Sequence, residues 1–431
     1  MSILFKNANV FTIDGIKKLD VFLDGKIIRT DSACLPDNFK KEIDCEGLFL
    51  FPGFADVHVH FREPGYSYKE TIFSGSSAAA RGGYTAVCTM PNIKPVPSTL
   101  ENLKKELDII AKDSVIRVYP IGAITMEQTG RGELSNIEEI APYVAAFSDD
   151  GKGIQEANLM RSAMERISKV GKLITAHCEI ESALKAGGCI NEGKYSELHG
   201  YTGINNASEY LEVQRDIKLS KETGCKFHVC HVSTKESVNL IREAKNEGIN
   251  VTAETAPHYL IFSDMDIEED GKWKMNPPIR SEQDRDALLN GIKDGTIDCI
   301  ITDHAPHSKE EKSRGLKGSA FGIVGLETCF PVMYSNIVLK SKVISLEKLL
   351  ELMCVNPRKI FNLPGSKYIN DGCEADFVIM DLEKVYRIDS RNFLSKGKST
   401  PFDGMEVRGE TVATYIDGRK VYDREKGIIN A

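Results

Sequence analysis

Between residues 54 and 305 the sequence alternates short apolar runs with longer segments of helical periodicity. Segments such as STLENLKKELDIIAKDS and NLMRSAMERISKVGK carry apolar residues at helical spacing and end near glycine or polar turn residues. Eight strands that alternate with helices over about 300 residues predict an α/β fold, a (β/α)8 TIM-type barrel. An open doubly wound sheet is the alternative, but no GxGxxG or GxxxxGKS/T motif opens any of the helices. The eight apolar runs cover residues 54–60, 84–90, 116–124, 143–148, 172–178, 226–233, 250–256 and 298–305.

Both ends of the chain have a different sequence pattern, in which short β-like runs are separated by Asp-Gly turn signals. Near the N-terminus these runs are ILFKNANVFT, KLDVFL and KIIRT, and near the C-terminus they are ADFVIMDL and TVATYIDGRKVYD. We therefore expect a small β-sandwich domain built from both termini. It would comprise residues 1–50 and 366–431, with the barrel inserted between them at 51–365.

The composition argues against several classes of protein. The net charge is −8, with no long basic run, so we expect no nucleic-acid partner. No apolar stretch reaches the roughly 18 residues of a membrane helix, and the N-terminal MSILFKNANVFTIDG does not resemble a signal peptide. These features predict a cytoplasmic protein without a membrane partner. The 11 cysteines form no CxxC pair, which favours reduced, buried thiols over a structural zinc finger.

Histidines and aspartates gather where the predicted strands end. In a barrel, active sites lie at the carboxyl ends of the strands, so side chains at these positions are candidates for chemistry. Four of the nine histidines of the chain fall there, and His307 follows the last run closely. The residues at the strand ends are His58, His60, Asp149, Asp150, His177, His231 and Asp303.

His58 and His60 are spaced so that both imidazoles point to one face of a strand and can reach one metal ion. Alone, this pair is equally well explained as two hydrogen-bonded histidines. Together with His177, His231 and Asp303 it favours zinc, which is bound by neutral imidazole and carboxylate. With an aspartate of the Asp149–Asp150 pair there would be six protein ligands, which are too many for one zinc ion and suit two ions that share a carboxylate.

The remaining candidates near these ligands have structural alternatives. Asp56 lies on the same strand face as His58 and His60, and it either braces the ligands or is a strand-end aspartate. His228 points to the opposite face from His231, so we interpret His228 as structural. The other histidines without a ligand position are His199, His258 and His304, which we expect to be core or loop residues.

Several motifs, taken together and in order, closely resemble the dihydroorotases of the class I bacterial type, in the amidohydrolase superfamily. The motifs are FADVHVHFREPG, TAVCTMPN, AFSDDGKG, ITAHCE, FHVCHVSTKES, VTAETAPH, KMNPPIR, ITDHAPH and FGIVGLET. The resemblance runs from about Phe51 to Lys420. A proline often precedes the FG pair in this family, whereas Ala320 stands here.

The resemblance implies a binuclear zinc site in a distorted barrel. His58, His60 and Asp303 would hold one zinc ion, and His177 and His231 would hold the other. Asp150 and a hydroxide would bridge the two. Many relatives use a carboxylated lysine as the bridge, but Lys152 falls two residues after the matching position. Asp149 is expected to be a turn residue before Gly151.

The implied reaction is the reversible cyclisation of N-carbamoyl-L-aspartate to L-dihydroorotate, a step of pyrimidine (UMP) synthesis. Asp303 would be the catalytic acid and base. Arg62 is well placed to bind the substrate carboxylate with two parallel hydrogen bonds. The resemblance also implies substrate contacts from His60, Asn92, Asn276 and His307 and from the backbone at Phe321 and Gly322. For the two asparagines, turn formation beside proline is the alternative.

The segment 307–322 is polar and contains several glycines, which predicts a surface loop that either covers the site or stays passively solvated. The rivals to this function are another cyclic amidohydrolase (an allantoinase, or a hydantoinase or dihydropyrimidinase), a zinc deaminase, and a non-catalytic scaffold paralogue. Arg62 and the aspartate bridge argue against the first group. Members of the family are commonly homodimers, and some associate with aspartate carbamoyltransferase.

Overall fold

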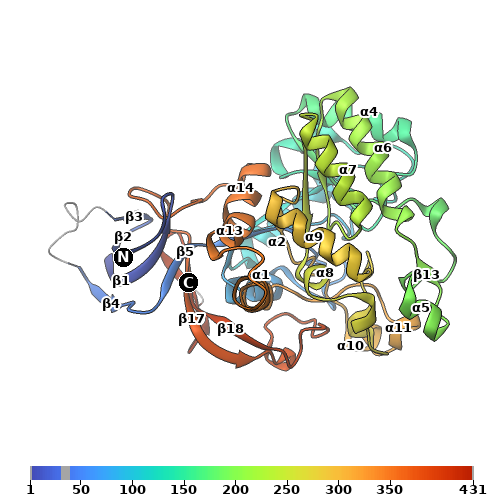
Figure 1. The fold of residues 1–431 in the computed structure, drawn as a ribbon. Helices are drawn as coiled ribbons and strands as arrows, with labels where there is room; N and C mark the ends of the chain where they lie inside the picture. Colours follow the sequence, from blue (N-terminus) through green and yellow to red (C-terminus); the bar gives the residue numbers. More distant parts are fainter. Residues whose placement is uncertain (1, 31–38, 430–431) are drawn as a thin grey trace.

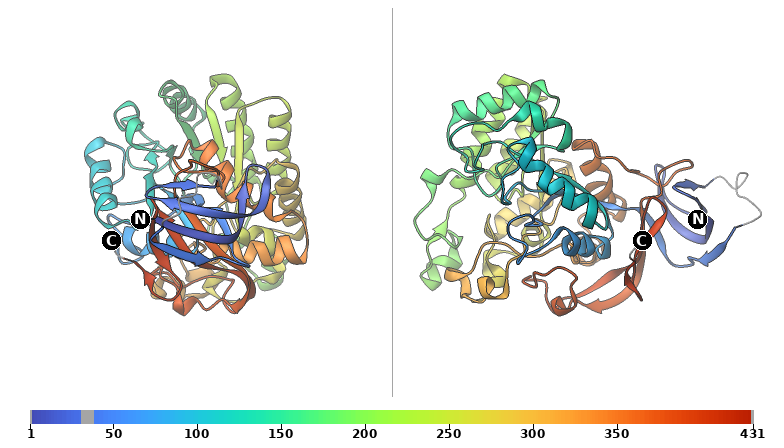
Figure 2. Two further views of the ribbon diagram at one scale, coloured as in Figure 1. Left: turned by 90° about the vertical axis from the view of Figure 1, so that its left-hand side faces the viewer. Right: turned by 180° about the vertical axis from the view of Figure 1, so that it is seen from behind.

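The computed structural model describes residues 2–30 and 39–429, and it separates a β-rich part formed by both termini from a larger part rich in helices (Figure 1). The two views in Figure 2 show the N- and C-terminal segments side by side. Within the described residues, no helix is long and apolar enough to cross a membrane. The cysteines in this part of the chain are unpaired, and all except Cys373 are buried.

All eight apolar runs contain strand structure, and consecutive strands pair in parallel. The pairing runs from β6 to β8 and from β9 to β16, and a parallel bridge from Val59 to His304 joins the last run to the first. The run 116–124 is divided at Ile121 into β8 and β9. The strands are β6 (Phe54–Val59), β7 (Tyr84–Thr89), β8 (Arg117–Pro120), β9 (Gly122–Ala123), β10 (Phe147–Ser148), β11 (Leu173–Ala176), β14 (Lys226–Val229), β15 (Val251–Thr255) and β16 (Cys299–Ile300).

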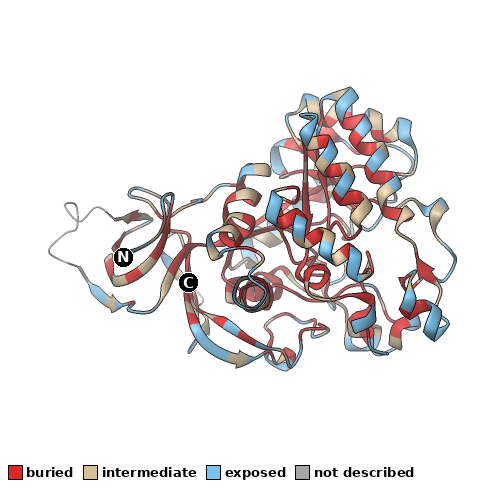
Figure 3. Ribbon diagram, viewed as in Figure 1, coloured by how far each residue is buried: buried red, intermediate tan, exposed pale blue. Residues whose placement is uncertain are grey.

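Helices follow these strands and pack against one another in sequence order, from α1 beside α2 to α7 beside α9. Each of these helices has one buried face, which lies toward the strands, and one exposed face, which points outward, as Figure 3 shows. Threonine or serine caps several N-termini, such as Thr71 before α1 and Ser281 before α9. The helices of this layer are α1 (Ile72–Arg81), α2 (Leu100–Asp113), α3 (Ile137–Ile140), α4 (Ala157–Lys169), α6 (Ala207–Thr223), α7 (Lys235–Asn246) and α9 (Glu282–Asp294).

Shorter elements lie in the excursions between strands and after β16. The small helices are α5 (Lys194–His199), α8 (Pro257–Ile261), α10 (Lys309–Lys312), α11 (Gly315–Gly318), α12 (Cys329–Met333), α13 (Leu346–Leu350) and α14 (Asn356–Ile360). Two π-helical segments, Tyr334–Lys340 and Glu351–Val355, continue α12 and α13. A separate parallel pair is formed by β12 (Ile190–Asn191) and β13 (Gly203–Ile204).

Strands from both termini form one nine-stranded sheet. Its path is β20-β19-β18-β17-β5-β1-β2-β3, with β4 beside β1. The expected Asp-Gly hairpin turn joins β18 to β19. The strands are β1 (Ser2–Thr12), β2 (Gly15–Asp24), β3 (Ile27–Arg29), β4 (Lys41–Asp44), β5 (Phe49–Pro52), β17 (Phe377–Arg387), β18 (Glu406–Ile416), β19 (Arg419–Asp423) and β20 (Gly427–Ile428).

An ion pair connects the parallel strands to this terminal sheet. Arg117 of β8 donates from Nε to Asp376 at 2.7 Å and from Nη2 to Asp417 at 2.8 Å. Asp376 is buried, and its carboxylate also accepts a hydrogen bond from the backbone of Asp417 at 2.8 Å. Removing the guanidinium would therefore leave a buried carboxylate without its cation.

We expect Arg117→Ala to lower the free energy of unfolding by about 2 kcal/mol, because one partner of a largely buried pair is lost. Urea-induced unfolding measures the change. The matched control is Arg391→Ala, which removes an exposed partner of Asp389 and should shift the transition little. Equal unfolding midpoints for Arg117→Ala and wild type would contradict the prediction.

Candidate metal centre and active site

The six predicted ligands lie at the same ends of the parallel strands. His58 is on β6 and His60 follows it, while Asp150, His177, His231 and Asp303 follow β10, β11, β14 and β16. All six side chains are buried. Parallel strands bring their carboxyl ends to one edge, so residues far apart in sequence meet here.

Asp150 is the centre of this cluster. Its Oδ1 lies 3.2 Å from Nε2 of His58, 3.6 Å from Nε2 of His231 and 4.0 Å from Nδ1 of His177. Its Oδ2 lies 3.5 Å from Nε2 of His60. One carboxylate therefore faces all four imidazoles, an arrangement that suits a shared ligand.

Asp303 lies beside the two histidines of the first strand. Its Oδ1 is 3.0 Å from Nε2 of His60 and 3.7 Å from Nε2 of His58. Burial raises the pKa of Asp303, but the hydrogen bond to His60 and the charges of nearby histidines outweigh burial and lower the pKa to about 2. The carboxyl group is therefore held ionised beside the imidazoles.

The side chains present fit a metal ion. Donor atoms of His58, His60 and Asp303 lie within 4.8 Å of one another, and so do those of His58, Asp150 and His231. His58 Nε2 and Asp150 Oδ1 are buried without a hydrogen-bond partner among the described residues. Buried polar atoms normally have a hydrogen-bond partner, so these two unpartnered atoms, both of types that bind metal ions, indicate a metal site.

Three of the candidate residues have a left-handed backbone. The φ angle is +62° at Arg62, +30° at His231 and +46° at Asp303. Non-glycine residues rarely adopt this conformation, and those that do concentrate at functional sites. The surrounding structure therefore fixes the directions in which these side chains leave the strand ends.

Glu254 on β15 is a site residue that the sequence reasoning missed. Its Oε1 is 2.6 Å from Nδ1 of His58, and its Oε2 is 3.0 Å from Nε2 of His228. Burial raises the pKa of Glu254, but the charge of His58 and the hydrogen bonds of both histidines lower it to about 2. A carboxylate in this position orients the ligand imidazole. The available signal was an acid within a run of otherwise buried strand residues.

The carboxylates of Asp56 and Asp149 accept hydrogen bonds from backbone N–H groups around the site. Asp56 accepts hydrogen bonds from the backbone N–H of His58 and from the backbone and hydroxyl of Thr302, so it joins β6 to the segment after β16. Asp149 forms the expected turn, since its carbonyl accepts from Lys152. Its buried side chain does more than the sequence indicated, because it accepts from the backbone of Ile124, Thr125 and Gly130.

The other histidines lie outside the ligand cluster. His228 bonds Thr252 and Glu254, and His304 lies between Glu70 and the backbone of Gly325. His199 is exposed and stacks on Tyr195. His258 is buried near the cluster, and burial lowers its pKa to about 4. These contacts agree with structural roles.

The predicted substrate residues surround the cluster in three groups. Asn92 Oδ1 is 2.9 Å from Nδ1 of His60. Asn276 donates to Glu179 at 2.9 Å, and Glu179 lies 3.9 Å from Nε2 of His177.

Arg62, His307 and Phe321 form the third group. His307 Nε2 is 2.7 Å from the carbonyl oxygen of Phe321 and 3.5 Å from Nη2 of Arg62. Gly322 has φ +132°, and a Cβ there would meet the carbonyl oxygen of Ala305 at 2.6 Å. Glycine is therefore required where this backbone crosses the segment after β16.

Segment 307–322 is more structured than the predicted surface loop. It contains α10 and α11, and Leu316 packs in a buried cluster with Trp273 and Ile279. Lys312 is also buried and donates to the carbonyl oxygens of Lys274 and Ala320. The polar sequence did not reveal these two anchors.

Known proteins match this chain over its full length. A family model described as Dihydro-orotase-like matches residues 47–237. A dihydroorotase of Fusobacterium nucleatum is 49% identical, with 98% of this chain and 99% of the relative covered. One from Staphylococcus epidermidis is 46% identical, with 98% and 100% covered.

The chain belongs to the dihydroorotase family. It is therefore an enzyme of the cyclic amidohydrolase class, as the sequence motifs predicted. Among solved structures, the L-hydantoinase of Arthrobacter aurescens is similar, with a TM-score of 0.88, 27% identity and coverage of 99% of this chain and 97% of that one. The dihydropyrimidinase of Brevibacillus agri, at 23% identity and a TM-score of 0.84, covers 100% of this chain and 96% of its own and shares the fold. The dihydroorotase family and these enzymes thus have one mixed α/β architecture in common.

We expect Glu254→Gln to weaken metal binding by about 10-fold to 100-fold, because the amide no longer supplies the charge that orients His58. Metal content after dialysis against a graded series of chelator concentrations measures the loss. Glu106→Gln is the matched control, since Glu106 is buried on α2 and accepts a hydrogen bond from Thr89, which is not a candidate ligand. Equal metal retention by the two variants would show that Glu254 does not support the site.

Proposed function

We propose that this protein is a class I bacterial-type dihydroorotase that interconverts N-carbamoyl-L-aspartate and L-dihydroorotate in pyrimidine synthesis. The observation that supports it best is the convergence of four histidines on Asp150 with Asp303 beside them. Arg62, a cation suited to a substrate carboxylate, lies on the same side of the fold.

We assign two zinc ions to the cluster. His58, His60 and Asp303 would hold one, His177 and His231 the other, and Asp150 would be shared. Bound zinc would supply Lewis acidity, which polarises the substrate carbonyl and makes a water molecule acidic near neutral pH. The distances around Asp150 support a shared ligand, since Oδ1 faces His58, His177 and His231 while Oδ2 faces His60.

In the hydrolytic direction, water adds to the ring amide carbonyl carbon, and the bond from this carbon to the ring nitrogen breaks. Asp303 is the base that takes the proton of the attacking water and then gives it to the departing nitrogen. Ring closure runs through the same groups in reverse: the ureido nitrogen attacks the side-chain carboxyl carbon and water leaves. As the nitrogen attacks, Asp303 accepts its proton and then gives this proton to the oxygen that leaves as water.

The substrate's remaining carboxylate would bind Arg62 by two parallel hydrogen bonds. Arg62 is buried and its Nε lies 3.4 Å from the carbonyl oxygen of Pro306, so the guanidinium has little freedom. Asn92, Asn276, His307 and the backbone at Phe321 and Gly322 would complete the contacts, together with His60. This carboxylate recognition favours dihydroorotate over the uncharged rings of hydantoinase substrates.

We further assign residues 51–365 to a distorted (β/α)8 barrel and residues 1–50 and 366–431 to a β-sandwich. The pairing of the parallel strands supports the barrel, and the nine-stranded sheet supports a terminal domain, although β5 continues to Pro52. A cytoplasmic homodimer, with association to aspartate carbamoyltransferase, completes the proposal on the basis of the family.

The purified protein should contain two equivalents of zinc and hydrolyse dihydroorotate but neither hydantoin nor allantoin. Metal analysis and assays on the three substrates measure this. The variant Asp303→Asn should retain its fold and lose turnover by a factor of at least about 100, because the proton acceptor is gone. Preferential hydrolysis of hydantoin, or near-normal activity of this variant, would overturn the assignment.

Arg62→Met should raise the KM for dihydroorotate by about 10-fold to 100-fold, because a charge-assisted pair of hydrogen bonds is lost. Steady-state kinetics in the hydrolytic direction measure the change. Arg81→Met, which removes a guanidinium that pairs with Glu327 elsewhere in the fold, is the control. An unchanged KM in Arg62→Met would mean that the substrate carboxylate binds a cation other than Arg62.

A further inference from the structure

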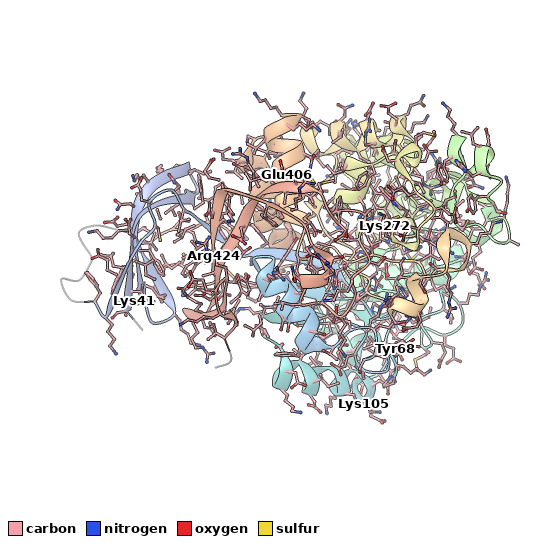
Figure 4. All side chains as sticks on the ribbon, turned by 90° about the horizontal axis from the view of Figure 1, so that it is seen from below. Lys41, Tyr68, Lys105, Lys272, Glu406 and Arg424 are labelled. Atoms are coloured by element: carbon pink, nitrogen blue, oxygen red, sulfur yellow. The ribbon has the colours of Figure 1, made fainter. Side chains whose placement is uncertain are left out.

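Lys69, which the proposed mechanism does not use, lies beside His307. Its Nζ is 3.2 Å from Nδ1 of His307 and 2.9 Å from Oε1 of Glu311. The hydroxyl of Tyr68 donates to the same Glu311 oxygen at 3.2 Å, and Figure 4 shows Tyr68 on this side of the molecule. The segment after β6 is thus connected to the segment after β16 through a charged group that touches the imidazole.

The two nearest polar partners of His307, both closer than Arg62 Nη2 at 3.5 Å, favour one neutral tautomer. Its Nε2 is 2.7 Å from the carbonyl oxygen of Phe321, so Nε2 must carry the hydrogen that it donates. Its Nδ1 then has a free lone pair, and the ammonium of Lys69 donates to it. In the opposite tautomer, an N–H would face the ammonium and a lone pair would face the carbonyl, so both contacts would be lost.

The surrounding charges also oppose the doubly protonated imidazolium. Burial and the cations Arg62, Lys69 and Lys312 lower the pKa of His307 to about 3. Within residues 2–30 and 39–429, the acid that faces the ring is Glu311, whose Oε2 is 3.4 Å from Nδ1 and already accepts from the backbone of Ser308 at 2.9 Å. Lys69 therefore stands between His307 and a carboxylate that would otherwise favour a proton on Nδ1.

We propose that Lys69 is a positioning residue for the substrate-carboxylate edge of the site. It holds His307 in the Nε2-protonated form that binds the Phe321 carbonyl beside Arg62. The identity of the substrate rests on the proposed function, whereas the effect of Lys69 on His307 does not. Lys69 itself is not placed in contact with the reacting atoms.

Losing the ammonium has a definite consequence for the proton on His307. With Lys69 absent, Glu311 becomes the nearest partner of Nδ1, and the imidazole pKa rises toward its ordinary value of about 6.5. Below that pKa both nitrogens are protonated, so the Nε2–H donor is kept. Above that pKa the two neutral tautomers mix, and part of the population loses the bond to the Phe321 carbonyl. The defect should therefore grow as the pH rises.

The experiment compares Lys69→Met and Lys69→Arg with wild type as zinc-loaded enzymes. At about pH 8, Lys69→Met should raise the KM for dihydroorotate roughly threefold to tenfold, the size of one hydrogen bond, with little change in kcat. The ratio of its KM to that of wild type should fall as the pH is lowered below the new imidazole pKa. The KM of Lys69→Arg should stay close to that of wild type, since arginine keeps a cationic donor.

Lys245→Met is the matched control. Lys245 on α7 is also partly buried, and it pairs at 2.6 Å with Asp298, which precedes β16, whereas the candidate ligands follow the carboxyl ends of the strands. This variant should leave the pH dependence of KM unchanged. An equal rise in KM for both lysine variants, or a rise in Lys69→Met that does not vary with pH, would reduce Lys69 to a structural role and overturn the proposal.

Nitrogen-15 NMR of histidine-labelled enzyme tests the same proposal without substrate. In wild type the resonances of His307, assigned by a His307→Gln variant, should show a neutral Nε2–H ring that does not titrate between about pH 6 and 8. In Lys69→Met the ring should titrate in that interval. An unchanged ring would overturn the inference, whereas inactivity of wild type on dihydroorotate would overturn only the proposed function.

Discussion

Burial of ionisable groups is the constraint on which this site depends. His58 is fully buried, with Glu254 2.6 Å from one ring nitrogen and Asp150 3.2 Å from the other. A single buried charge costs several kcal/mol, so acids and imidazoles must alternate for the cluster to be stable. The alternation extends through Glu254 to His228, away from the strand ends. The ligand cluster is thus built into the core, and its members cannot be changed independently.

Sequence reasoning predicted the strands and the convergence of the six candidate ligands because both follow from local patterns and one topological rule. Each histidine or aspartate ends an apolar run, and parallel strands bring such ends together. Glu254 could not be found in this way, because the imidazole that it orients lies on β6, nearly two hundred positions earlier in the chain. The strand order of the terminal sheet was hidden for the same reason, since β5 pairs with both β1 and β17.

Segment 307–322 shows a different limit of the sequence. Its polar residues and glycines indicate exposure on average, and Lys309, Glu310 and Lys317 are indeed exposed. Polarity does not reveal that Lys312 turns inward to two carbonyl oxygens or that Leu316 joins a cluster with residues of the segments 189–195 and 267–279. Burial of an ammonium requires acceptors that only the folded backbone of Lys274 and Ala320 supplies. Which residues of a loop become its anchors is therefore set by the tertiary structure.

The backbone at Arg62 separates substrate recognition from metal binding. In a regular strand, Arg62 would point to the same face as His58 and His60, because side chains two residues apart share a face. A guanidinium there would lie among the proposed zinc ions and compete with them for Asp150 and Asp303. The left-handed conformation at Arg62 breaks this alternation and directs the side chain to Pro306 and His307 instead. The conformational cost at one residue thus keeps the guanidinium that we propose for substrate binding apart from the proposed zinc ions.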